Sequence, residues 1–227
     1  MQPSEASKIR GPFSPWIPAL LVATTAACGG SGTSPSPSIP TLQGTVTDPQ
    51  GDALSALPSV SVSPDLVGAT IEVASGNLTV TVSFAHGTLS QTQTVWYAAL
   101  DTDENPATGR PGLVASIPGN FGDTDLLGVD YEIAAVYPRN ATQATIFRVT
   151  AAPPVQPTII GVAVVTFPSG DSARVTVPLS LLGNDDGRLK FKVVAQQWLT
   201  DSSTTITLHG AFLDYMSNLG LAPGVVR

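Results

Sequence analysis

The sequence predicts an all-β protein, an antiparallel β-sandwich of the jelly-roll type, and three observations lead to this prediction. Only 12% of the 227 residues are charged, whereas a large helical protein covers its exposed faces with Lys, Arg and Glu. Short runs of alternating apolar and polar residues recur from residue 69 onward, as expected for half-buried strands. Turn-forming residues separate these runs, and 42% of the chain is hydrophobic, which is enough for a core.

The clearest strand is Leu78–Phe84, in which apolar side chains alternate with Thr79, Thr81 and Ser83. A strand places alternate side chains on opposite faces, so this run predicts one buried and one exposed face. Other predicted strands lie at residues 69–73, 94–100, 129–136, 144–149, 158–166, 173–177, 189–196 and 204–208.

Helical signals are few. Phe212, Tyr215, Met216 and Leu219 share helical spacing ahead of Gly220, which predicts one short C-terminal helix. Residues 178–183 predict a single helical turn.

Composition also excludes several classes of function. The formal net charge is −7, and an acidic chain has no basic surface for the phosphates of nucleic acid. The single cysteine rules out an intramolecular disulfide framework and any multi-cysteine metal site. The chain has no G-x-S-x-G elbow, phosphate-binding loop or H-E-x-x-H motif, so we do not expect an enzyme.

The first 27 residues read as an export signal. Lys8 and Arg10 precede an apolar stretch over residues 16–27, which is shorter than the ~20 residues that span a bilayer. This pattern is typical of a secretory signal peptide. An ordinary signal peptide cleaved near Ala27 is one reading of the segment.

The residues Thr25-Ala26-Ala27-Cys28 favour a second reading. They resemble the lipobox of bacterial lipoproteins, although Thr25 stands where that family usually has Leu. The resemblance implies that Cys28 is lipidated and becomes the first residue of the mature chain. Two acyl chains suffice for stable anchoring. We therefore expect a membrane-anchored protein of the bacterial cell envelope, on its periplasmic or its surface face.

A flexible tether is predicted over residues 28–58, followed by one sandwich domain over residues 59–227. Residues 29–40 read GGSGTSPSPSIP, a composition that gives flexibility and local extension but cannot form a core. A second stretch rich in Pro and Gly, residues 47–58, is either further linker or a first loop.

An acidic loop is the one segment with distinctive chemistry. Seven acidic residues and one basic residue, Arg110, lie between positions 101 and 132. Asp101, Asp103 and Asn105 alternate directly after a predicted strand, as oxygen ligands do in calcium loops. The loop is not an EF-hand, because that pattern requires Gly and Glu where this chain has Pro106 and Gly112.

The sequence therefore predicts a calcium site with Asp101, Asp103 and Asn105 as ligands, completed by Asp125 or Asp130. The alternative is a solvated loop in which Asp and Asn side chains cap turns through local hydrogen bonds.

The order of features resembles a known group of domains. A strand is followed by LDTDENPATG, a Gly/Asp loop, then GVDYEI at residues 128–133 and VPLSLLGNDDGRLKF at residues 177–191. This order is similar to DOMON-like β-sandwiches, which include family 9 carbohydrate-binding modules. The resemblance covers residues 63–198 and implies an antiparallel sandwich with a ligand face. It also implies structural calcium held by Asp101, Asp103 and Asp130.

Carbohydrate binding would need exposed aromatic rings as stacking platforms, and the candidates are Trp198, Tyr131 and Tyr137. Trp96 and Tyr97 point to opposite faces of one strand, so one of them should lie in the core. Two functions stay open: a membrane-anchored binding module, with carbohydrate as the expected ligand, and a structural or adhesive envelope lipoprotein with protein partners.

Overall fold

The computed structural model describes the chain from residue 41 onward, with internal gaps. The described residues are 41–53, 63–89, 94–111, 127–137, 142–150, 157–197, 212–216 and 222–227. The predicted signal peptide, Cys28, Asp125 and Trp198 lie outside these ranges, as does the strand predicted at residues 204–208.

The described part of the chain is almost entirely β, so the predicted fold class is confirmed. The strands are β1 (Leu42–Thr47), β2 (Leu66–Ala74), β3 (Asn77–Phe84), β4 (Thr94–Asp101), β5 (Arg110–Pro111), β6 (Gly128–Val129), β7 (Tyr131–Tyr137), β8 (Gln143–Arg148), β9 (Thr158–Ser169), β10 (Ser172–Pro178), β11 (Leu189–Gln197), β12 (Phe212–Met216) and β13 (Gly224–Val226). The one helical element among the described residues is a 3-10 turn, η1 (Leu179–Leu182), which lies where a helical turn was predicted.

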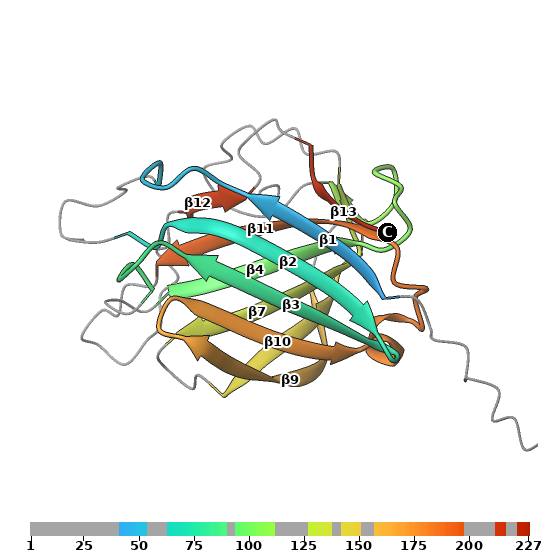
Figure 1. The fold of residues 1–227 in the computed structure, drawn as a ribbon. Helices are drawn as coiled ribbons and strands as arrows, with labels where there is room; N and C mark the ends of the chain where they lie inside the picture. The colour runs from blue at the N-terminus through green and yellow to red at the C-terminus, as the bar shows by residue number, and fades with distance from the viewer. Residues whose placement is uncertain are drawn as a thin grey trace, which may run out of the picture. The chain divides into compact units, whose positions relative to one another are not determined.

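One large antiparallel sheet contains all strands except β5 and β6, which form a separate pair. Its order is β1-β2-β3-β10-β9-β8-β7-β4-β11-β12, with β13 also pairing with β11. The long strand β9 joins two layers, because residues before Val165 pair with β8 and residues after it pair with β10. In Figure 1, β1, β2, β3 and β10 cross the near layer, with β4, β7 and β11 behind them.

The two ends of this sheet meet. The backbone N–H of Gln43 in β1 donates to the carbonyl of Arg227, which follows β13, at 3.2 Å. Because β13 pairs with β11, this bond nearly closes the sheet on itself. Closure satisfies backbone groups that an open edge strand would leave exposed.

The core lies between the two layers and follows the predicted alternation. Leu78, Val80, Val82 and Phe84 of β3 are buried, whereas the residues between them are partly exposed. Trp96 is the largest fully buried side chain in the part of the chain that the structure describes, so the prediction that one of Trp96 and Tyr97 belongs to the core is confirmed. The partly exposed Tyr97 packs against a smaller cluster that includes Leu127 and Val194.

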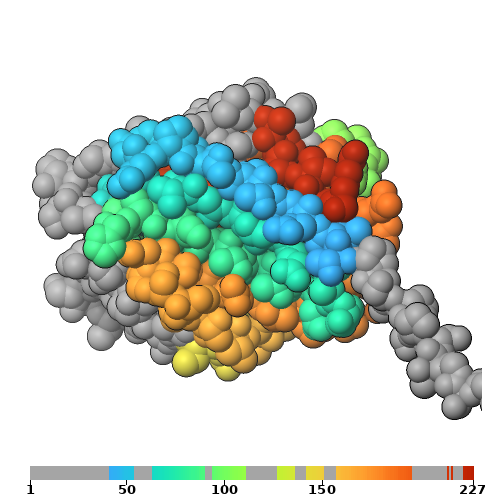
Figure 2. All heavy atoms as spheres, in the orientation of Figure 1, coloured from blue at the N-terminus to red at the C-terminus, as the bar shows by residue number. Residues whose placement is uncertain are grey.

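Figure 2 shows the face formed side by side by β1, β2, β3 and β10. Its outward side chains are rich in threonine. Thr45 lies 3.2 Å from Thr70, and Thr79 lies 3.1 Å from Thr176, oxygen to oxygen. These hydroxyl pairs explain how a sheet with few charged residues presents a polar face to water.

Two sequence predictions are wrong in part. The predicted tether, residues 28–58, contains β1, which pairs with β2 over its whole length. The strand β1 has few apolar residues of its own. Its position requires the backbone of β1 to lie close to the backbone of β13. A Cβ on Gly44 would lie 2.4 Å from the carbonyl oxygen of Val225.

The predicted C-terminal helix is also wrong over residues 212–216, which form β12. Asp214 and Met216, two positions apart, are both buried, as residues on one face of a strand are. Pairing with β11 overrides the helical spacing of the aromatic residues. Within the ranges described, no helix has the length and apolar character to cross a bilayer.

Candidate metal centre

Three of the predicted ligands meet at one rim of the sheet. Asp101 is the last residue of β4, Asp103 lies in the following loop, and Asp130 directly precedes β7. Each offers a carboxylate oxygen, and these oxygens all lie within 4.8 Å of one another. The register explains the meeting, because Leu100 pairs with Tyr131 and the N–H of Asp130 donates to the carbonyl of Leu100 at 2.9 Å.

Asp101 is the buried member of this cluster, with 0% of its surface exposed. Its carboxylate accepts hydrogen bonds from the N–H groups of Asn105, at 3.0 Å, and Gly128, at 3.2 Å. Position 128 has no room for a side chain, because a Cβ there would lie 2.1 Å from the carbonyl oxygen of Thr108. Glycine at 128 therefore lets the acidic loop pack directly on β6.

The loop also caps its own turns, as the alternative prediction stated. Asp103 accepts from the Thr108 hydroxyl at 2.7 Å and from the Asn105 N–H at 2.9 Å. The side-chain oxygen of Asn105 accepts from the N–H of Ala107 at 3.1 Å. Asn105 thus acts in a local turn, and that bond uses the oxygen predicted to be a ligand.

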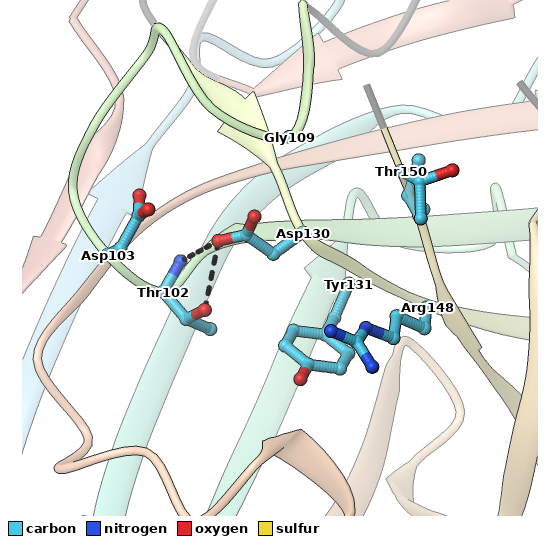
Figure 3. Close-up of a pocket in the computed structure, with 8 residues that line it drawn as sticks. Thr102, Asp103, Gly109, Asp130, Tyr131, Arg148 and Thr150 are labelled. Carbon is cyan, nitrogen blue, oxygen red and sulfur yellow. Dashed lines mark hydrogen bonds between the residues drawn. The ribbon is translucent and has the colours of Figure 1, made fainter. Parts of the chain in front are cut away.

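Asp130 is held from the other side of the cluster. One of its carboxylate oxygens accepts from both the N–H and the hydroxyl of Thr102, at 3.0 and 2.9 Å, as Figure 3 shows. Local turns and convergence of the acids therefore coexist in this structure.

The electrostatics of the cluster disfavour a full set of charges. Burial, together with the neighbouring charge of Asp103, raises the pKa of Asp101 to about 6, although the bonds from Gly128 and Asn105 oppose the shift. Burial acts against ionised Asp103 as well, but hydrogen bonds from Thr108 and Asn105 outweigh it and hold the pKa of Asp103 below its ordinary value. Of these two carboxyl groups, the buried one of Asp101 is therefore the harder to ionise.

A fourth acid, Asp185, belongs to this neighbourhood and was missed by the sequence analysis. Burial, followed by the charges of Asp186, Asp130 and Asp103, raises its pKa. Its segment, Asn-Asp-Asp-Gly at residues 184–187, has a composition typical of a hairpin turn, but that prediction is wrong, because the flanking strands β10 and β11 do not pair with each other. Its acidic composition was the signal that could have identified it.

A cavity of about 360 Å³ adjoins the cluster (Figure 3). It is lined by Thr102, Asp103, Gly109, Asp130, Tyr131, Arg148, Val149 and Thr150. The lining brings carboxylates, hydroxyls and one guanidinium group to the same space. Such a set can donate to and accept from a polar, hydroxyl-rich ligand.

Of the three predicted aromatic platforms, only the Tyr131 side chain is described. It lines the cavity but is buried, with 8% of its surface exposed, so it does not offer an open stacking face. Tyr137 ends β7, and its side chain lies outside what the structure describes, as does Trp198.

The single basic residue of the acidic segment, Arg110, forms a buried ion pair with Glu132 of β7. Both side chains are almost fully buried, so the pair ties the short β5–β6 sheet to the large sheet. Removing one partner of such a pair leaves an uncompensated charge.

Searches against protein-family models, curated proteins and solved structures found no match to this chain. The resemblance to DOMON-like and family 9 carbohydrate-binding domains therefore rests on the order of sequence features alone.

Proposed function

We propose that the chain is an exported, lipid-anchored binding module whose rim holds a calcium ion beside a ligand cavity. The observation that carries the proposal is the meeting of Asp101, Asp103 and Asp130 within 4.8 Å. These acids come from two segments that are brought together by strand pairing.

Calcium fits the donor set. Carboxylate oxygens are its usual ligands, at 2.3–2.6 Å in 6–8-coordinate sites. Burial, together with repulsion from Asp103, raises the pKa of Asp101, and a divalent ion would offset both effects. Asp185 extends the acidic surroundings of the site.

The adjoining cavity supports a carbohydrate as ligand. Sugar hydroxyls can donate to Asp103 and Asp130 and accept from Arg148, all of which line the cavity. A calcium ion at the cluster would lie next to this space and would also hold the acids in place. The ligand cavity therefore depends on the same loop as the ion.

The calcium site is tested by thermal unfolding of the full chain in EDTA and in CaCl₂. Calcium should raise the melting temperature, and Asp101→Ala or Asp103→Ala should remove the increase. Glu72→Ala is the control, because it removes one exposed acid from β2 without touching the rim. An equal calcium response in wild type and both variants would refute the site.

Ligand binding is tested on a glycan array with and without calcium. We expect a glycan signal that Arg148→Ala weakens and that calcium removal reduces. Trp198→Ala, Tyr131→Ala and Tyr137→Ala test the predicted aromatic contributions. If no glycan binds under either condition, the carbohydrate proposal fails.

A second candidate function, a structural or adhesive envelope protein, is favoured by one observation. β9 carries large apolar side chains on its outer face: Ile159, Val162 and Val164 are 64%, 56% and 66% exposed. Val162 and Val164 share a face of the strand, and an apolar stripe of this kind suits contact with another protein. Cross-linking in whole cells should capture envelope partners that Val162→Thr/Val164→Thr loses, whereas the binding-module proposal predicts an unchanged cross-linking pattern.

A further inference from the structure

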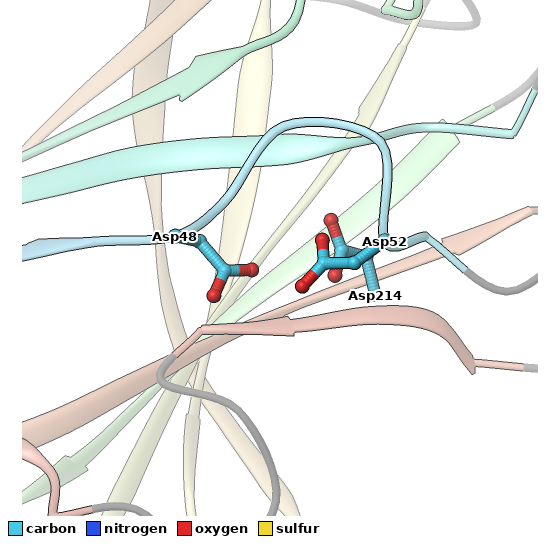
Figure 4. A group of neighbouring side chains, drawn as sticks. All are labelled: Asp48, Asp52 and Asp214. Atoms are coloured by element: carbon cyan, nitrogen blue, oxygen red, sulfur yellow. The ribbon is translucent and has the colours of Figure 1, made fainter.

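A second acidic cluster lies at the other end of β11 from the first. Lys190 of β11 pairs with Asp101, whereas Ala195 pairs with Asp214. Asp48 and Asp52 flank the turn after β1, and their carboxylates and that of Asp214 point toward one another (Figure 4). One carboxylate oxygen from each lies within 4.8 Å of the other two.

Asp65, which precedes β2, contacts the same turn. Its Oδ2 accepts from the N–H of Gly51 at 2.8 Å, and Gly51 lies between Asp48 and Asp52. Asp214, which is 4% exposed, accepts from the N–H of Leu66, the first residue of β2. Four carboxyl groups therefore surround one turn.

Two oxygens of this group are buried without a hydrogen-bond donor among the described residues. They are Oδ1 of Asp65 and Oδ2 of Asp48. Asp65 is only 6% exposed, so water does not readily replace the missing donor. A buried carboxylate oxygen without a partner is costly, and native structures pair such groups with a donor or a cation.

The electrostatics of this group reflect the same crowding. Burial, together with the charges of Asp52 and Asp65, raises the pKa of Asp48 to about 6. Burial likewise raises the pKa of Asp65, against the hydrogen bond from Gly51. Both shifts reflect the cost of holding these carboxylates ionised in this place, which a bound cation would lower.

We propose that Asp48, Asp52, Asp65 and Asp214 form a second divalent-cation site, of the calcium type, at the seam of the rolled sheet. β1 and β12 are the two ends of the sheet order, and the turn after β1 supplies two of the acids while β12 supplies a third. Oxygen donors from three separate segments match the preference of calcium for several carboxylate ligands. The ion would join β1, β2 and β12 at this seam.

The test is calorimetric titration of the EDTA-stripped full chain with CaCl₂ at neutral pH, together with thermal unfolding. The wild type should bind two ions per chain, and Asp48→Asn/Asp52→Asn should bind one. The double variant should also lose part of the rise in melting temperature caused by calcium. In EDTA it should melt no lower than the wild type, because it removes two crowded charges, and this comparison separates loss of metal from misfolding.

Asp103→Asn is the matched variant for the first cluster and separates the two proposals. If Asp48→Asn/Asp52→Asn binds as many ions as wild type, with the same calcium-induced rise in melting temperature, the seam site is refuted. If only Asp103→Asn leaves calcium binding unchanged, the first site, at Asp101, Asp103 and Asp130, is refuted and the seam site is supported. The loss of one ion in each variant supports both sites.

Discussion

The buried carboxyl of Asp101 should make the metal-free protein less stable as the pH rises. Its pKa is about 6 in the folded chain, compared with an ordinary value of 3.8. The folded state therefore holds a proton between these values that the unfolded state releases. The stabilising contribution is fully present below pH 3.8 and is lost as the pH rises through about 6.

The size of this effect follows from the shift. A change of about 2 pKa units corresponds to about 3 kcal/mol at 1.36 kcal/mol per unit. Solvent at the rim screens part of it, so we expect a contribution of about 1–2 kcal/mol between pH ~4 and pH ~7.5.

The assay is urea unfolding in EDTA at these two pH values, for wild type and for Asp101→Asn. The neutral amide loses one of the two hydrogen bonds from Asn105 and Gly128, but that loss is the same at both pH values. The fall in unfolding free energy from low to neutral pH should be smaller in the variant than in wild type, by about 1–2 kcal/mol. Glu72→Gln, on the exposed side of β2, controls for the removal of one charge.

Calcium should reverse the dependence in wild type, because an ion favours the ionised carboxylate. In CaCl₂ the unfolding free energy should rise with pH. The reasoning is refuted if Asp101→Asn and wild type show the same pH dependence in EDTA.

Three further predictions concern other parts of the chain. Gly128→Ala should lower the unfolding free energy by about 2–4 kcal/mol and weaken the calcium response, because its Cβ would lie 2.1 Å from a backbone oxygen of the acidic loop. Gly170→Ala is the control, with no atom within 4 Å of the added Cβ, and urea unfolding of the two variants measures the difference. Arg110→Ala should lower the unfolding free energy by about 3–5 kcal/mol in the same assay, because it leaves the buried Glu132 without its ion-pair partner. A decrease below about 1 kcal/mol would contradict this. Cys28→Ala should release the protein from the membrane fraction, and globomycin should block its processing; retention and normal processing would rule out the lipid anchor.

Much of the local structure could be predicted from the sequence, because it depends on neighbouring residues. Alternation in Leu78–Phe84 predicted both the strand β3 and its buried face. The low charged content and the spacing of turns predicted the all-β class. The acidic composition of residues 101–132 located the rim cluster, since a strand end and its following loop are close in sequence.

Local patterns failed where distant pairing decides the structure. Residues 212–216 have helical spacing but form β12, because β11 offers a partner. Residues 42–47 look like linker but form β1, because β2 pairs with them. The lipid anchor and the carbohydrate ligand stay predictions, since neither Cys28 nor Trp198 lies in the described residues.

The amino-acid sequence by itself determined the strands with clear alternation, such as β3, together with their two faces and the acidic loop, because each follows from residues within a few positions of one another. Only the tertiary structure decided which acids meet. Leu66 and Asp214 are 148 positions apart, yet they share a hydrogen bond beside the second cluster. Such a meeting depends on strand register and on closure of the sheet, which arise from pairing along the whole chain.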